Sequence, residues 1–307
     1  MRVDCETLWL RRVAGLVLGL ALVVSVLPGC STNPATGRRQ FNTLSVEEEI
    51  ALGEQAEGDF IASNGGLIPD AGIRAHVENL GQQLAAVSER PDLPWEFHVI
   101  DSRQINAFAL PGGKVFMSRG LMEKMTNEAQ LAGVLGHEVG HVTAQHIGQR
   151  LTRGKLISGL AIVGGIIGAT SDNDWAKALG VGASVGGSVY LLRFSRSNEH
   201  ESDTLGVRYM TRLGYNPYGQ VQVMEILKEA AGDGSSGLFK SFFSTHPLPE
   251  ERIDDLRDLI AEQYPQAGQP GAFNYGEASF ERNILRPLRA LPPAKHPSAA
   301  PQAESSR

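Results

Sequence analysis

The strongest constraint on this chain is a five-residue motif, His137-Glu138-Val139-Gly140-His141, which lies inside a segment with a helical pattern of apolar residues. Two histidines four positions apart on an α-helix project from the same face, one turn apart. Their imidazole nitrogens can therefore bind one tetrahedral Zn²⁺. Glu138 is rotated about 100° from that face, which suits a general base for an attacking water better than a ligand. The motif predicts one zinc ion per chain; the alternative is a surface helix with two unrelated histidines.

Composition excludes several classes of protein. The 307 residues are 42 % hydrophobic and 20 % charged, which suits one medium globular domain with appendages. The formal net charge of −6, without a basic stripe, argues against nucleic acid as a partner. The two cysteines, Cys5 and Cys30, provide neither a disulfide framework nor a cysteine zinc site.

The N-terminal segment is typical of a targeting signal. Two arginines precede an apolar run over 13–27, which has the length of a signal-peptide core and is short for a membrane span. The run ends in the letters LPGC, which resemble the bacterial lipoprotein processing box. We therefore expect a signal peptide over 1–29, a lipidated Cys30 and a polar tether over 30–40. An ordinary signal peptide or an uncleaved anchor is the alternative.

The following residues predict an α+β domain that is mainly helical. Ser45, Asp70 and Asn127 are good N-caps, and each precedes a segment with helical periodicity. A strand is expected over 95–100. Two further strands, over 105–110 and 114–118, flank a Pro-Gly-Gly turn and should form a hairpin. This order predicts a small antiparallel sheet beside the helix that carries the zinc motif.

Two segments are expected to differ from the rest of the domain. The glycine-rich, apolar stretch 154–193 reads as a helical hairpin whose two runs are each shorter than the roughly 20 residues of a membrane span. It either packs over the domain or dips into a membrane. The Pro/Ala-rich stretch 265–307 is expected to be a disordered tail. The zinc domain should therefore cover 41–264.

A third metal ligand is expected within 194–203, where four candidates occur: Glu199, His200, Glu201 and Asp203. Glu199 and Asp203 are four residues apart and share a helix face, so one can bind the metal while the other orients a ligand. His200 and Glu201 read as flanking residues.

The remaining histidines receive different interpretations. His146 follows His137 by nine residues, about 180° around an ideal helix, so it should pack or cap elsewhere. His76 and His98 lie in predicted core elements. His246 precedes a predicted helix and lies in a loop that could reach the metal.

Together these motifs carry a family resemblance. HEVGH, then FSRSNEHESD, then STHP with Arg252, and NAFALPGG ahead of the zinc helix, resemble the HtpX-like zinc metallopeptidases, metallopeptidase family forty-eight. The resemblance covers Phe41 to Tyr264 and is greatest to bacterial periplasmic lipoprotein members. It implies a gluzincin-type fold. It also implies these roles: His137, His141 and Glu199 as zinc ligands, Glu138 as base, and Asp203 as the residue that orients a ligand.

The resemblance also singles out His246. In a periplasmic member the matching loop histidine caps the metal, which implies that His246 is a latch over the site. The competing interpretations are a hydrogen-bond donor to the oxyanion during catalysis, and a loop histidine with no role.

These features predict a zinc-dependent endopeptidase of the bacterial envelope, anchored by lipid at the periplasmic face of the outer membrane. Its substrates would be unfolded or misassembled envelope proteins, which would add as a strand beside the hairpin at 105–118. One alternative is a lipoprotein chaperone or assembly factor that uses the zinc fold as a scaffold. Another is a metal-dependent hydrolase of non-peptide bonds.

Overall fold

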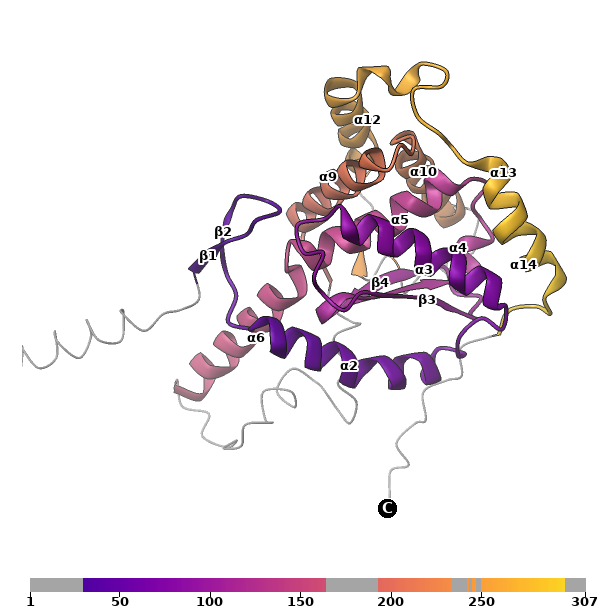
Figure 1. Ribbon diagram of the computed structural model, residues 1–307. Coiled ribbons are helices and arrows are strands. Elements are labelled where there is room, and N and C mark those ends of the chain that lie inside the picture. Colours follow the sequence, from indigo (N-terminus) through magenta and orange to yellow (C-terminus); the bar gives the residue numbers. More distant parts are fainter. Residues whose placement is uncertain (1–29, 164–192, 233–241, 243–244, 247–249, 296–307) are drawn as a thin grey trace, which may run out of the picture.

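The computed structural model describes residues 30–163, 193–232, 242, 245–246 and 250–295, and has the expected α+β architecture (Figure 1). A small sheet lies among helices that come from both halves of the chain. In chain order the elements are β1 (Cys30–Thr32), β2 (Arg39–Phe41), α2 (Val46–Ser63), α3 (Ala71–Ala86), β3 (Glu96–Ile100), β4 (Ala107–Leu110), η1 (Pro111–Gly113), β5 (Lys114–Ser118), α4 (Arg119–Met122), α5 (Glu128–Thr143), α6 (His146–Val163), α9 (Arg196–Arg212), α10 (Tyr218–Gly232), α12 (Glu251–Gln263), η2 (Pro265–Gly268), α13 (Glu277–Phe280), η3 (Glu281–Leu285) and α14 (Arg286–Ala290).

The sheet is mixed, with strand order β3-β5-β4. The hairpin prediction is confirmed, because β4 and β5 pair antiparallel with Phe108 opposite Phe116. The prediction of an antiparallel sheet is wrong for β3, which pairs parallel to β5 with Phe97 opposite Val115. The hairpin places β5 between the other two strands, and β3 runs opposite to β4, so β3 and β5 point the same way.

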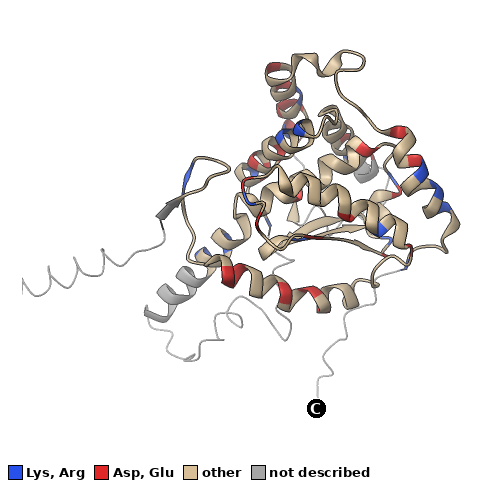
Figure 2. Ribbon diagram, viewed as in Figure 1, with Lys and Arg blue, Asp and Glu red and all other residues tan. Residues whose placement is uncertain are grey.

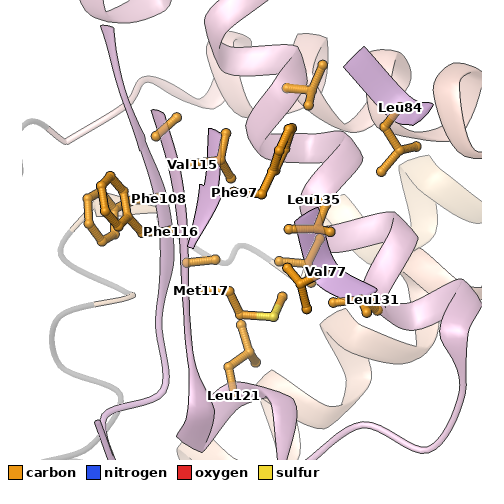
Figure 3. Close-up of a cluster of buried hydrophobic side chains, with 14 of the residues drawn as sticks. Val77, Leu84, Phe97, Phe108, Val115, Phe116, Met117, Leu121, Leu131 and Leu135 are labelled. Carbon is orange, nitrogen blue, oxygen red and sulfur yellow. The ribbon is translucent and has the colours of Figure 1, made fainter. Parts of the chain in front are cut away.

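Helices cover both faces of this sheet. On one face, the Phe60 ring of α2 packs against Phe108 and Phe116, with ring centroids 4.2 Å and 4.9 Å away. On the other face, Val115 and Met117 lie toward the apolar side chains of α3 and α5 (Figure 3). Burial of this apolar surface is the main stabilising contribution of the core.

The predicted helix starts are confirmed by their caps. Ser45 and Glu48 form a reciprocal capping box at α2. The Asp70 side chain accepts a hydrogen bond from the Ile73 amide, 2.8 Å away, at α3. Asn127 does the same for the Gln130 amide at α5, at 3.0 Å.

Glycines permit α9 to lie directly against α5. A Cβ atom on Gly136 of α5 would stand 3.1 Å from the Gly206 carbonyl oxygen of α9. A Cβ atom on Gly206 would stand 2.9 Å from the His137 amide nitrogen. Larger residues would force the helices apart and would separate the chemistry-bearing side chains that the two helices carry.

The segment expected as a tether is part of the fold. Strands β1 and β2 form an antiparallel ribbon, with Thr32 opposite Arg39. The buried Asn33 amide donates a 3.1 Å hydrogen bond to the Thr143 carbonyl oxygen at the end of α5. The ribbon therefore satisfies a terminal carbonyl that the helix itself leaves unpaired.

The expected disordered tail is also folded over 265–295, so that prediction is wrong for these residues. Phe280, Ile284 and Leu288 are buried in the main core. Their spacing of four gives one apolar helix stripe, which the surrounding Pro- and Ala-rich composition masks in the sequence. The described elements therefore begin at Cys30 and extend to Ala290, beyond both ends of the expected 41–264, and 296–307 lie outside the described residues.

The glycine-rich stretch is described only in part. Helix α6 extends to Val163, and most of the predicted hairpin, 164–192, lies outside the described residues. Among the helices that are described, none combines the length and the hydrophobicity needed to cross a membrane. Figure 2 shows that acidic side chains lie along α2, whereas arginines lie on α14.

Candidate metal centre

Helix α5 brings the two motif histidines together. The Nε2 atoms of His137 and His141 are 3.0 Å apart. The outer nitrogen of His137, Nδ1, lies 2.8 Å from an Asp203 carboxylate oxygen. Because a carboxylate accepts hydrogen bonds, this contact places the proton of His137 on Nδ1 and leaves its Nε2 lone pair facing His141.

Helix α9 adds the carboxylates. Glu199 and Asp203 project from the same face, as their spacing predicts. The Glu199 oxygens lie 3.6 Å from His137 Nε2 and 3.5 Å from His141 Nε2. The four-residue spacing therefore gives the two carboxylates different partners. Glu199 faces the inner nitrogens of both histidines, and Asp203 faces the outer nitrogen of His137.

The His246 ring lies in the same cluster. His246 Nδ1 lies 3.1 Å from a Glu199 oxygen, and His246 Nε2 lies 3.7 Å from Glu138 Oε1. The ring is fully buried, and its Nε2 makes no hydrogen bond to any residue that the structure describes. One ligand atom from each of His137, His141, Glu199 and His246 lies within 4.8 Å of the others.

Glu138 is buried next to this cluster without belonging to it. Its Oε2 atom makes no hydrogen bond in the described structure. Burial raises the pKa of Glu138, although the nearby His246 and His137 rings oppose that shift. An apolar pocket opens beside Glu138, lined by Val134, Val223, Met224, Leu227 and Phe242. This arrangement suits a base that works at the edge of a substrate pocket.

The residues fit a metal ion. A tetrahedral zinc ion with bonds near 2.0–2.2 Å separates its ligand atoms by roughly 3.3–3.6 Å, close to the spacings among His137, His141 and Glu199. The inner nitrogens of the two histidines also direct electron density at one point, which would repel unless a cation lay between them. The cluster is thus a candidate site for a metal cation.

Arg252 of α12 balances the charge of the buried carboxylates. Its guanidinium donates to Glu199 Oε2 at 2.6 Å and to both Asp203 oxygens at 2.8 Å. Burial would raise the pKa of Glu199, but His246, His141 and Arg252 hold that pKa well below its usual range. Arg252 and His137 likewise lower the pKa of Asp203 against the effect of burial. Both carboxylates are therefore ionised, and their positions are fixed.

The prediction that His146 packs elsewhere is wrong. Its Nδ1 lies 2.9 Å from the Nδ1 of His141, and its Nε2 lies 3.0 Å from a Glu201 carboxylate oxygen. Glu201, read from the sequence as a flanking residue, therefore reaches the site through His146. The cause is a break in the helix: α5 ends at Thr143, Gln145 has a left-handed φ of 56°, and α6 begins at His146. A glutamine in that conformation gives no signal in the sequence.

The other candidates lie apart from the site. His200 is exposed near Asp255, while His76 and His98 pair with Glu128 and Glu57 at 2.6 Å and 2.7 Å. Cys30 begins β1, and its side chain is not among the described parts of the structure.

The fold and the site define a class of protein. A helix with the His-Glu-x-x-His motif, a glutamate from a later helix and a small sheet beside them together form a metallopeptidase-type domain of the gluzincin kind. The sequence matches the model of Peptidase family M48 over residues 73–260. The chain belongs to this family, as the motifs predicted.

Individual relatives agree with that assignment. Over 245 residues the chain is 31 % identical to the Beta-barrel assembly-enhancing protease of Yersinia pestis, covering 78 % of this chain and 49 % of the relative. The protein of the same name in Escherichia coli K12 is 29 % identical over 241 residues, with the same coverage. The Mitochondrial metalloendopeptidase OMA1 of Schizosaccharomyces pombe is 30 % identical over 231 residues, covering 75 % of this chain and 66 % of the relative. The chain spans about half the length of the two bacterial relatives.

Proposed function

We propose that this chain is a zinc-dependent endopeptidase. The observation that carries the proposal is the buried Glu138. One of its carboxylate oxygens has no hydrogen-bond partner among the described residues, and it lies beside three convergent ligand residues, His137, His141 and Glu199. A buried polar atom without a partner is unfavourable for folding, and its retention here points to a role in binding or chemistry.

The chain's own residues divide the work. Zinc, when bound, would supply a Lewis acid that polarises a carbonyl and acidifies water. His137, His141 and Glu199 would hold it, with Asp203 and Arg252 fixing their orientation. Glu138 would accept a proton from the attacking water as a C–O bond forms at the scissile carbonyl. It would then deliver that proton to the departing amine as the C–N bond breaks.

Two features support a polypeptide as substrate. Strand β4 lies at an edge of the sheet, next to α5, so an extended chain could pair with it. The pocket beside Glu138 is lined by apolar side chains, which would accept an apolar side chain of the substrate next to the scissile bond.

We propose further that His246 is a latch. Phe242 stacks on its ring at a centroid distance of 5.2 Å, and Phe194, whose amide donates to the Thr245 carbonyl at 2.9 Å, stacks on His141 at 4.0 Å. These contacts hold a buried imidazole in the space next to Glu138, where the attacking water would stand. The ring must withdraw before a substrate carbonyl can enter.

The location and the substrates remain proposals drawn from sequence and relatives. The LPGC sequence supports a lipid anchor at Cys30, with the chain on the periplasmic face of the bacterial outer membrane. The relatives named beta-barrel assembly-enhancing proteases support unfolded or misassembled envelope proteins as substrates.

The variant Glu138→Gln tests the proposal. It should keep one zinc per chain, because Glu138 is not a ligand, and should lose at least ~10²-fold in turnover of unfolded protein. Elemental analysis and a casein-cleavage assay on the same preparation measure both quantities. Near-normal cleavage by this variant would remove Glu138 as the base. Zinc binding without any cleavage by the parent chain would favour a chaperone or assembly factor.

A further inference from the structure

A chain of polar contacts leads from the surface to His141. The two Nδ1 atoms of His141 and His146 are 2.9 Å apart, and His146 Nε2 lies 3.0 Å from Glu201 Oε2. Glu201 in turn pairs with Arg38, which precedes β2 in the N-terminal ribbon and also donates to Ser197 Oγ at 3.2 Å. His146 is fully buried, whereas Arg38 is exposed.

The protons along this chain can be assigned from the contacts. A carboxylate only accepts hydrogen bonds, so Glu201 requires the proton of His146 on Nε2. A neutral His146 then presents a lone pair at Nδ1. The 2.9 Å contact needs one donor and one acceptor, so His141 must carry its proton on Nδ1. His141 Nε2 is then left with the lone pair that faces His137 and Glu199.

The two candidate ligand histidines are therefore oriented differently. Asp203 holds the outer nitrogen of His137 directly, at 2.8 Å. No carboxylate reaches the outer nitrogen of His141 among the described residues; an imidazole stands there instead. The His146 ring connects His141 of α5 to the Glu201 carboxylate of α9.

We propose that His146 and Glu201 form a positioning relay, which fixes the tautomer and ring angle of His141 and so prepares Nε2 for the metal. The inference rests on the proposed zinc site but not on proteolysis. Its structural basis is the break between α5 and α6 at Gln145, which places the His146 ring against His141. Two neighbours flank the His146 side chain. The Ser202 hydroxyl lies 3.4 Å from His146 Nδ1, and the centroid of the Phe194 ring lies 6.2 Å from that of His146.

Zinc affinity provides the first test, measured by competition with a chromogenic chelator in the full chain carrying Glu138→Gln, which removes self-cleavage. His146→Leu deletes the acceptor and should weaken zinc binding about 10–100-fold, the usual cost of losing such a partner. His146→Asn places an amide oxygen near the former Nδ1 position and should recover most of that loss. Glu201→Gln should give a smaller loss, since the amide oxygen can still accept.

A matched control is His76→Leu. His76 also pairs with a glutamate, Glu128 at 2.6 Å, and Glu128 lies on the same helix as the ligands but nine residues before His137. This variant should leave zinc affinity unchanged. Parent-like zinc affinity in His146→Leu would overturn the relay. Equal weakening in His146→Leu and His146→Asn would also overturn it, because it would show that bulk and not the acceptor matters.

Nitrogen-15 NMR of the histidine rings in the zinc-loaded Glu138→Gln chain gives a readout that needs no change at His146. The relay predicts a protonated Nε2 and a bare Nδ1 on His146. A proton on Nδ1 with a bare Nε2, or a doubly protonated ring, would contradict it. If the parent chain binds no zinc at all, the proposed function fails first, so the two failures are distinguishable.

Discussion

At the scale of single residues, two buried glutamates have opposite acid–base properties because their neighbours differ. Glu138 receives no hydrogen bond from Arg252 in the described structure, and burial raises its pKa against the opposing effect of His246 and His137. Glu199 receives a hydrogen bond from Arg252 and lies against His246 and His141, which hold its pKa well below the usual range despite its burial. Burial therefore favours the protonated form of Glu138, whereas Glu199 stays anionic, as a metal ligand must.

The variant His246→Ala distinguishes the two proposed roles of this histidine. If the ring is a latch, His246→Ala should raise basal casein cleavage and self-cleavage, because it frees the space beside Glu138. If the ring instead donates to the oxyanion, the same variant should lose ~10²-fold or more in turnover.

The comparison needs a control in the same segment. Thr245 is buried and donates from its hydroxyl to the Phe242 carbonyl at 3.0 Å, within one turn of His246. Thr245→Ser keeps that hydroxyl and should leave cleavage unchanged. Initial rates of casein cleavage, with zinc content measured in parallel, distinguish the two roles of His246. A parent-like rate in zinc-loaded His246→Ala would exclude both roles.

At the scale of elements, the site depends on the close packing of α5 against α9. Each helix supplies half of the centre, and Gly136 and Gly206 set their separation. Arg252 of α12 then joins Glu199 to Asp203 across one turn of α9. A third helix thus fixes the spacing between a candidate ligand and the residue that orients His137.

Patterns confined to one element could be read from the sequence, whereas relations between elements could not. The caps at Ser45, Asp70 and Asn127 and the hairpin were predictable because their signals lie within a few residues. The shared face of Glu199 and Asp203 followed from helix geometry. The parallel pairing of β3 depends on strand order, which no local signal encodes.

The two clearest errors have physical causes. Extrapolating an ideal helix placed His146 on the wrong side, because the helix ends at Thr143 and the left-handed Gln145 precedes a new helix. The Pro- and Ala-rich composition gave no sign of the C-terminal helices. A few apolar residues are enough to bury a helix against the core when they lie in a stripe on one face of it. Phe280 is the largest of these, and it is fully buried.

That stripe yields a stability prediction. Phe280→Ala should lower the free energy of unfolding by about 3–5 kcal/mol, the usual cost of removing a buried aromatic ring. Urea unfolding of the zinc-saturated protein, followed by circular dichroism, measures it. Arg286→Ala, an exposed residue one turn and a half further along, should change stability by no more than ~0.5 kcal/mol. A loss in Phe280→Ala as small as that of the control would contradict the folded C-terminal segment.

At the scale of the whole molecule, the N-terminal ribbon connects the proposed anchor to the candidate centre. Cys30 begins β1, Asn33 caps the end of α5, and Arg38 pairs with Glu201. A chain held at Cys30 would therefore have its candidate centre close to the membrane surface. That position suits an enzyme that acts on proteins inserting into the same membrane.

The anchor can be tested directly. Cys30→Ser should abolish labelling with a palmitate analogue and move the protein from the detergent phase to the aqueous phase. Cells expressing both forms at matched levels, extracted with alkaline carbonate, provide the measurement. Full membrane retention of Cys30→Ser would instead assign the attachment to another part of the chain, either 1–29 or the apolar stretch 154–193.

The most direct test of the central claim is removal and return of the metal, followed in one preparation by zinc content and by cleavage of an unfolded outer-membrane protein. A chelator should strip one zinc per chain and abolish cleavage, and stoichiometric zinc should restore both in the parent chain. In Glu138→Gln, zinc should return without cleavage. Cleavage that persists in metal-free protein would contradict the account, as would a fully reloaded parent chain that cuts no polypeptide.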